Sequence, residues 1–149
     1  MTGSEKDSLH VLFLQVLRYH FIRYHHLLGR IGLHRGQPLV LGLLWEKDGR
    51  TQGEIAEALC LRPATVTVVL RRMEKAGLLE RKSDPEDLRV VRVYLTERGR
   101  ALEGDVRAIH DTLEKECFRN FTPEEKALLR KFFIRMRENL RAIVEKETP

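Results

Sequence analysis

The sequence predicts a mainly α-helical protein with one small β-hairpin. Two short helical patterns within residues 51–76 are joined by a tight turn, which ends at Pro63. Strand-like stretches lie on both sides of Asp84-Pro85, and in the second of them Val91, Val93 and Leu95 alternate with Arg92 and Tyr94, as in a hairpin. Long helical patterns flank this central part at both ends of the chain. Helix, turn, helix and hairpin in this order describe a winged helix-turn-helix between N- and C-terminal helices.

The first two helices are expected before residue 50. Apolar residues recur at helical spacing from Leu9 to about Leu28 and cover more than one stripe of that helix. A second helix is expected from Leu39 to Glu46, and it should end near Gly49. The residues that separate the two helices include the helix breakers Gly29, Gly32, Gly36 and Pro38.

The central helices have recognisable ends. Thr51 and Glu54 have the spacing of a capping box, which predicts the start of a short helix. Pro63 suits the first turn of the next helix, where its missing N–H is not needed. Gly77 is typical of a residue that ends a helix. The core-facing positions of this second helix are predicted to be Val66, Leu70 and Met73.

The hairpin and the last two helices follow. Residues 78–82 and 90–95 are predicted to form a two-stranded hairpin, with its turn at Asp84-Pro85. Thr96 is expected to cap a long helix, and Thr122 with Glu125 forms a second capping box before the last helix.

The distribution of charge points to a polyanionic partner. The chain of 149 residues carries a net charge of +5. Most of the excess lies in residues 62–82, where the acids are Glu74 and Glu80 and the bases are Arg62, Arg71, Arg72, Lys75, Arg81 and Lys82. Such a segment fits a nucleic-acid contact, although a solvated basic helix face would have the same composition.

The compartment is expected to be the cytoplasm. No apolar run approaches the ~18 residues that cross a bilayer, and the N-terminus lacks the apolar stretch of a signal peptide. Cys60 and Cys117 lie far apart, which indicates free thiols rather than a disulfide framework.

The segment TQGEIAEALCLRPATVTVVLRRMEKAGLLERKSDPEDLRVVRVYLTERGRAL resembles the MarR family of winged-helix transcription regulators. The resemblance covers about Arg35 to Leu102 and includes the Asp-x-x-Asp-x-Arg pattern of residues 84–89. It implies a sequence-specific, double-stranded-DNA-binding regulator without catalytic activity, expected to act as a repressor. The single domain of residues 1–149 would comprise a DNA-binding unit at about 36–100 and dimerisation helices at about 5–34 and 101–147.

The predicted DNA contacts lie on the two central helices and the wing. The N-terminal part of the second helix would enter the major groove, and basic residues would bind phosphates. Val68 and Leu88 stand where the family often has polar or basic residues. The candidate contacts are Thr51, Gln52, Arg62, Ala64, Thr65, Thr67, Val68, Arg71, Arg72, Lys82 and Arg89.

The acidic wing tip has a role that the resemblance suggests. Arg89 would enter the DNA minor groove, where the potential is most negative. Asp84 and Asp87 would hold its guanidinium by charge-assisted hydrogen bonds. A solvated turn in which these acids only satisfy turn geometry is the alternative.

The terminal helices are expected to form a two-fold dimer, which would bind a near-palindromic operator. The alternative is that this apolar stripe is intramolecular core, and some of it is expected to be. The candidate interface residues are Leu12, Phe13, Val16, Leu17, Phe132, Phe133, Met136, Leu140, Ile143 and Val144.

The sequence also bears on ligands other than DNA. Regulators of this type are commonly released by a small aromatic acid, for which the candidate pocket is Tyr19, Arg23, Tyr24 and Trp45, although such aromatics also fit ordinary packing. The spacing of His20, His25 and His26 does not suit paired metal ligands, so neither a metal nor another cofactor is expected. The alternatives to a DNA-binding regulator of this kind are a winged-helix protein-interaction or assembly module and a redox sensor that uses Cys60.

Overall fold

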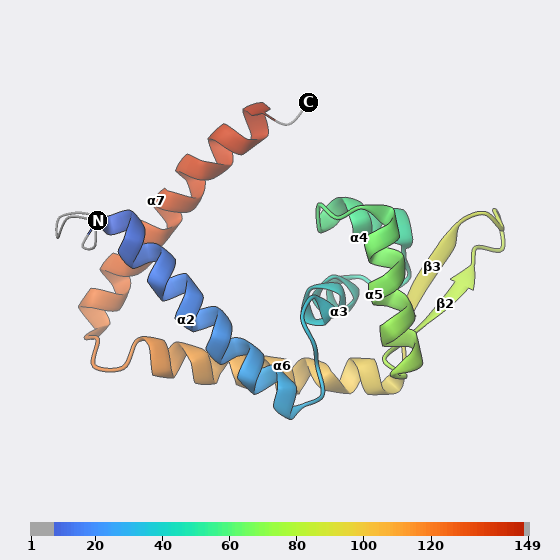
Figure 1. Cartoon of the computed structure of the whole chain (residues 1–149), viewed down its shortest axis with the longest axis horizontal. Helices are drawn as coiled ribbons and strands as arrows, with labels where there is room; N and C mark the ends of the chain where they lie inside the picture. Colours follow the sequence, from blue (N-terminus) through green and yellow to red (C-terminus); the bar gives the residue numbers. More distant parts are fainter. Residues whose placement is uncertain (1–7, 148–149) are drawn as a thin grey trace. The chain divides into compact units, whose positions relative to one another are not determined.

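The computed structural model describes residues 8–147 and divides into two compact units, Met1–Leu113 and Glu114–Pro149. Residues 5–7 of the predicted N-terminal dimerisation segment lie outside the described part. The mainly helical class with a small sheet is confirmed (Figure 1). Its elements are α2 (Leu9–Arg30), α3 (Gln37–Glu46), β1 (Arg50–Thr51), α4 (Gln52–Ala58), α5 (Pro63–Lys75), β2 (Leu79–Ser83), β3 (Val91–Leu95), α6 (Glu97–Cys117) and α7 (Pro123–Glu147).

The helix-turn-helix consists of α4 and α5, which pack against each other in the first unit (Figure 1). The predicted capping box opens α4: the backbone N–H of Glu54 donates to Thr51 Oγ1 over 3.0 Å, and the Thr51 N–H donates to Glu54 Oε2 over 2.7 Å. Pro63 is the first residue of α5. The three predicted inward residues are all buried: Val66, Leu70 and Met73. These local signals therefore fix the orientation of α5 about its axis.

The sheet has three antiparallel strands in the order β1-β3-β2, so the predicted two-stranded hairpin was incomplete. β2 pairs with β3 from Leu79 opposite Leu95 to Ser83 opposite Val91. On the other edge of β3, Arg50 pairs with Val93 and Thr51 with Arg92. A strand of two residues has no detectable alternation, and Thr51 already carried the stronger signal of a helix cap. The extra strand ties the hairpin directly to the start of α4.

The segment that connects the sheet to α6 is closely packed. Thr96 Oγ1 donates to the carbonyl of Gly77 and accepts from the N–H of Gly99, which caps α6 as predicted. A Cβ on Gly99 would lie 2.1 Å from the carbonyl oxygen of Leu78, so this position requires glycine. The carbonyl of Gly99 also accepts a hydrogen bond from Trp45 Nε1 over 3.0 Å. This junction fixes α6 against the core beneath the hairpin.

The long helices differ in how much of their surface the single chain covers. Leu27 and Leu28 of α2, with Val106, Ile109 and Leu113 of α6, belong to the hydrophobic core of the first unit. In the second unit, α7 begins with the predicted capping box of Thr122 and Glu125 and contains no buried residue. Within residues 8–147, no helix is both long and apolar enough to cross a membrane.

Candidate nucleic-acid interface

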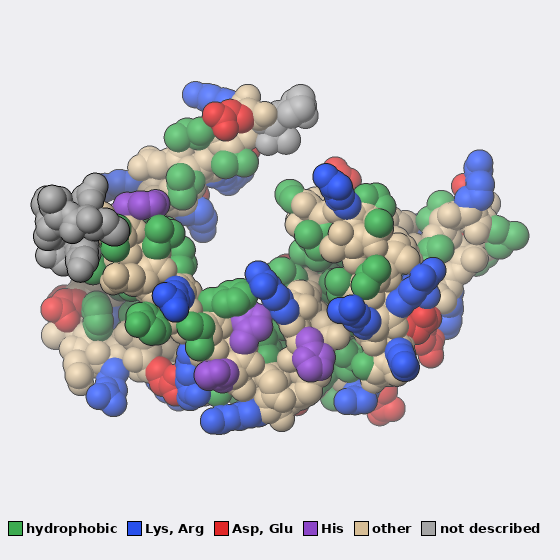
Figure 2. Space-filling model, in the orientation of Figure 1, with side chains coloured by type: hydrophobic (Ala, Val, Ile, Leu, Met, Phe, Trp, Pro, Cys, Tyr) green, Lys and Arg blue, Asp and Glu red, His purple; other side chains and the backbone are tan. Residues whose placement is uncertain are grey.

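The outer face of α5 is open to solvent and rich in cations. Lys and Arg side chains surround the α4–α5 region and the wing in the space-filling view (Figure 2). Among the predicted DNA contacts on and before this helix, Arg62, Ala64, Thr65, Val68, Arg71 and Arg72 are exposed. Within residues 8–147, Arg62 and Arg72 take part in no ion pair, which leaves their charges available to phosphate oxygens.

Two other basic side chains of this segment are already paired. Arg81 binds Glu74 with both Nε and Nη2, at 3.0 and 2.9 Å from Oε2. These hydrogen bonds are the main reason that the pKa of Glu74 is lowered. Lys82 lies 3.3 Å from Glu80, but this pair is largely exposed and therefore weak. Among the described residues, the cations of this segment that form no ion pair are thus Arg62, Arg71, Arg72 and Lys75.

Three of the predicted polar DNA contacts make hydrogen bonds within the helix-turn-helix. Thr51 supplies the cap of α4. Gln52 Nε2 donates to Thr67 Oγ1 over 3.4 Å, and that hydroxyl donates to the carbonyl of Pro63 over 3.0 Å. Gln52 Oε1 is buried and has no partner among the described residues. This link was not predicted, because nothing in the spacing of Gln52 and Thr67 indicates that they meet.

The wing exposes the side chain of Arg89 to solvent. Arg89 Nε and Nη2 donate to the two carboxylate oxygens of Asp87 over 3.1 and 3.2 Å, while the side chain of Arg89 remains 91% exposed. The Arg89 side chain is the largest influence that lowers the pKa of Asp87. The hydrogen bonds to Asp87 therefore restrain the guanidinium of Arg89, while most of its surface stays accessible. The predicted minor-groove contact requires both properties.

Asp84 has a different partner from the one expected. It does not hold Arg89; its carboxylate accepts from Arg92 Nε and from the backbone N–H of Glu86. Asp84 is 8% exposed, and the Glu86 N–H, followed by Arg92, lowers its pKa. Arg92 lies within β3, and the alternating pattern of that strand placed it on the polar face. Its hydrogen bond holds Asp84 at the base of the wing, where the loop meets the strands. Asp84 thus supports the wing from below rather than the tip arginine.

The four residues predicted to line a small-molecule pocket differ in their burial and in their contacts. Tyr24 Oη lies 3.1 Å from His110 Nε2, and Trp45 packs on the core while donating to Gly99. Burial raises the pKa of Tyr24. Tyr19 is exposed and Arg23 is half-buried. The partners of Tyr24 and Trp45 give these two aromatics a packing role of their own.

Cysteines and metal-ligating groups add little to the site. Cys60 is exposed in the turn between α4 and α5, with a positive φ of 51°, and Cys117 is also exposed. Within the described residues, no three His, Cys, Asp or Glu side chains lie close enough to hold a metal ion.

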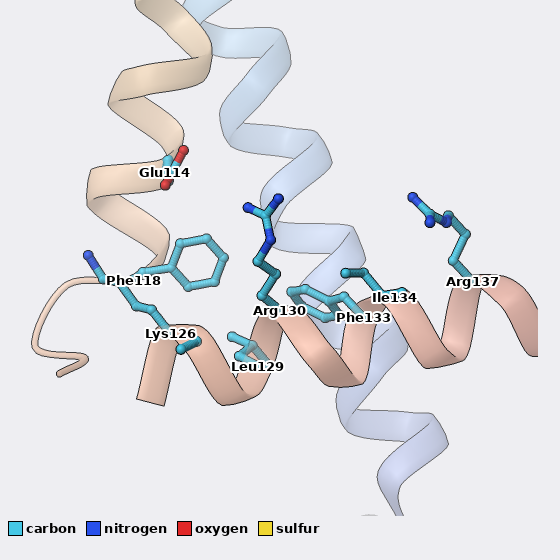
Figure 3. A pocket seen from close by; sticks show the side chains of 9 residues that line it. Glu114, Phe118, Lys126, Leu129, Arg130, Phe133, Ile134 and Arg137 are labelled. Atoms are coloured by element: carbon cyan, nitrogen blue, oxygen red, sulfur yellow. The ribbon is translucent and has the colours of Figure 1, made fainter. Parts of the chain in front are cut away.

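The terminal helices expose the apolar residues that were predicted to form a dimer. All ten side chains are between 39% and 59% exposed. In the second unit, the end of α6 and the first half of α7 line a groove of about 810 Å³. Figure 3 shows Arg130, Phe133 and Ile134 on one side of α7, with the ring of Phe118 extending toward Arg130. The expectation that part of the predicted stripe is intramolecular core is not met at these ten positions.

The geometry defines a class of protein. A helix-turn-helix whose second helix is exposed and flanked by cations, together with a wing that presents a restrained arginine, is the arrangement of a winged-helix DNA-binding protein.

Comparison with known proteins identifies the family. The model of the MarR family matches residues 33–91. The HTH-type transcriptional regulator TtmR of Methylorubrum extorquens is 38% identical over 60% of this chain, a match that spans 46% of TtmR. YsmB of Bacillus subtilis, an uncharacterized HTH-type transcriptional regulator, is 32% identical over 70% of this chain and 73% of its own length. The chain belongs to the MarR family, whose members are DNA-binding transcriptional regulators rather than enzymes.

Solved structures agree with this assignment. A crystal structure of MarR is 29% identical and superposes with a TM-score of 0.78, over 93% of this chain and 95% of that chain. The F27L mutant of S. aureus MepR, solved bound to an oligodeoxyribonucleotide, is 27% identical with a TM-score of 0.65, over 89% of this chain and 98% of that chain. Family membership favours a DNA-binding regulator over the assembly module that the sequence left open.

Proposed function

We propose that the protein is a cytoplasmic homodimeric repressor that binds a near-palindromic operator. The observation that carries the dimer is α7: a helix of 25 residues with no buried side chain, on which Phe132, Phe133 and Leu140 are exposed. Exposed apolar surface of this extent marks an association site. Association of two identical copies is most simply two-fold, which makes the two α5 helices equivalent.

Two-fold symmetry leads to the form of the operator. Paired recognition helices contact half-sites about one DNA turn apart, roughly 34 Å, so the target is an inverted repeat. In each half-site, α5 enters the major groove and Arg89 enters the adjacent minor groove. A dimer placed in this way over a promoter blocks access to the DNA, which is why repression is the proposed outcome. The DNA-bound relative MepR supports the DNA half of this proposal.

A pair of α7 variants tests the dimer. Leu140→Glu places a charge in the proposed interface. In light scattering, the wild-type protein should have twice the chain mass of 17.4 kDa, and this variant should have the mass of one chain. Asn139→Glu adds the same charge one position along the exposed helix and should leave the mass unchanged. A wild-type protein that is monomeric at micromolar concentration would refute the dimer.

A gel shift tests the operator. A promoter fragment containing an inverted repeat should be bound by wild-type protein and by Asn139→Glu. Leu140→Glu should bind it far more weakly, because a monomer contacts only one half-site. Equal binding by all three proteins would contradict a dimeric complex.

We also propose that the DNA is released by a small aromatic acid bound beside Tyr19, Arg23 and Tyr24 of α2. Trp45 is not included, because it binds Gly99, whereas Tyr24 contacts His110, about 16 Å further along α6. Titration of 4-hydroxybenzoate into a preformed protein–DNA complex should release the DNA. Retention of the complex at millimolar ligand removes this effector class from the proposal.

A further inference from the structure

The exposed side of α5 has an apolar centre. Successive residues of an α-helix are rotated by about 100°, which places Val68 almost opposite the buried Val66, Leu70 and Met73. Val68 is 48% exposed, whereas Val66 is 1% exposed. Ala64 lies one turn before Val68 on the same face, and Thr65 lies beside it. We refer to Ala64, Val68 and the methyl group of Thr65 as the apolar patch.

The first two turns of α5 offer few groups that read bases by paired hydrogen bonds. Paired contacts to guanine use Arg or Lys, and those to adenine use Asn or Gln. The stretch Pro63–Leu70 (PATVTVVL) contains none of these residues. Its Thr67 hydroxyl already donates to the carbonyl of Pro63 and accepts from Gln52. Among the side chains of this stretch, the hydroxyl of Thr65 is thus the main polar group left for a base edge.

Cations lie on both sides of the apolar patch. Arg62 precedes α5, and Arg71 and Arg72 follow one turn after Val68, all three exposed. Cations so placed suit phosphates at the two borders of a groove, with the apolar patch facing the base edges between them. The occupant of this face is therefore the floor of a major groove rather than an apolar protein surface.

We infer that the apolar patch of α5, centred on Val68, recognises thymine C5-methyl groups in the major groove. The methyl group of thymine is the one apolar feature among the base edges there, and aliphatic side chains contact it. This inference rests on the proposed DNA-binding function and adds a specificity to it: each half-site contains thymine at a position contacted by Val68. Guanine contacts by the first two turns of α5 contribute little to the choice of sequence.

Deoxyuridine provides the test, because it pairs like thymine and lacks only the methyl group. A duplex selected by the wild-type protein from a randomised thymine-containing pool is resynthesised with deoxyuridine at one symmetric pair of positions at a time. At the contacted position, the loss of affinity should be about fourfold for each methyl group removed, as for burial of one such group. Deoxyuridine outside the protected region serves as the DNA control.

Protein variants assign the effect to Val68. Val68→Ala should weaken binding to the thymine duplex and be nearly insensitive to deoxyuridine at the contacted position. Arg72→Ala should weaken binding to both duplexes by the same factor, since it loses a phosphate contact. Circular dichroism and sizing should be unchanged for Val68→Ala, because this side chain is about half exposed and lies away from the core.

The outcomes separate this inference from the function on which it rests. A selected duplex that binds tightly but equally well with deoxyuridine at every position overturns methyl recognition and leaves DNA binding intact. The same holds if Val68→Ala keeps the full deoxyuridine sensitivity. Failure to select any duplex, at low salt as well as high, overturns the DNA-binding proposal itself.

Discussion

Arg92 joins the base of the wing to the turn before the helix-turn-helix. Its Nε donates to the carboxylate of Asp84, and its Nη1 donates to the carbonyl oxygen of Gly49 over 3.0 Å. Asp84 in turn accepts from the N–H of Glu86, the second residue along the wing loop. A single side chain on β3 therefore connects the wing loop with the segment leading into β1 and α4. This connection fixes the direction in which the wing projects from the DNA-binding unit.

Removal of the Asp84 charge should loosen the wing and weaken DNA binding. In Asp84→Asn the amide is a poorer acceptor for Arg92 and for the Glu86 N–H, so the wing must be ordered when DNA binds. We expect affinity to fall roughly threefold to tenfold, the cost of ordering one or two side chains. Fluorescence anisotropy with a labelled operator measures this change, and circular dichroism should show an intact fold.

Glu86→Gln is the matched control for this variant. It removes the same negative charge from the same loop, but the described contacts of Glu86 involve its backbone N–H rather than its carboxylate. Less repulsion from DNA should leave its affinity unchanged or slightly raised. If Asp84→Asn also bound DNA more tightly, charge alone would explain Asp84 and its supporting role would be wrong.

The wing should keep its shape across the neutral pH range. Hydrogen bonds lower the pKa of both Asp84 and Asp87 from the ordinary value of about 3.9. A carboxyl group with a lowered pKa in the folded state stabilises that state at all pH values above its ordinary pKa. This stabilisation is lost as the pH falls through the lowered value. Amide exchange at Glu86 and Arg89, followed by NMR, should therefore show wing protection from pH 5 to 8 and loss only in strong acid.

Gly99 should tolerate no side chain. In Gly99→Ala, the new Cβ meets the carbonyl of Leu78, and the start of α6 must move away from Trp45 as well. Overpacking of this kind costs about 1–3 kcal/mol in the free energy of unfolding. Urea denaturation measures the loss. The control is Gly104→Ala in the same helix, where a Cβ has no neighbour within 4 Å and helix propensity should raise stability by up to about 1 kcal/mol.

Elements with local chemical signals could be located from the sequence, and contacts chosen by geometry could not. The capping boxes at Thr51 and Thr122 and the proline at Pro63 are local, so they marked helix starts correctly. Asp84 and Asp87 have two arginines within reach, Arg89 and Arg92. Which acid binds which arginine depends on how the loop folds, so the prediction that both acids bind Arg89 was wrong for Asp84. Strand β1 was missed because two residues are too few to show a pattern.

Arg72 of α5 and Arg81 of β2 should have opposite phenotypes. Arg72 forms no ion pair among the described residues, whereas Arg81 is bound by Glu74. Arg72→Ala should weaken binding to all sequences and reduce the slope of log K against log salt by about one, as expected for one lost phosphate contact. Arg81→Ala should instead lower the melting temperature and leave that slope unchanged. A slope that changes only in Arg81→Ala would reverse the two assignments.

Arg89 should contribute to affinity without contributing to stability. Its pair with Asp87 is too exposed to stabilise the fold measurably. In a narrow minor groove, however, the guanidinium meets a concentrated negative potential. Arg89→Ala should therefore reduce affinity about tenfold, most strongly for operators with an A-tract under the wing, while melting temperature and dimer mass stay unchanged.

A double-mutant cycle then isolates the role of Asp87. If Asp87 orders the guanidinium for the groove, Asp87→Ala weakens binding in the wild-type background and has no such effect in Arg89→Ala. If Asp87 acts only as a negative charge near DNA, its removal strengthens binding equally in both backgrounds. Anisotropy titrations of the four proteins with one A-tract operator distinguish these results, because the two roles of Asp87 change affinity in opposite directions.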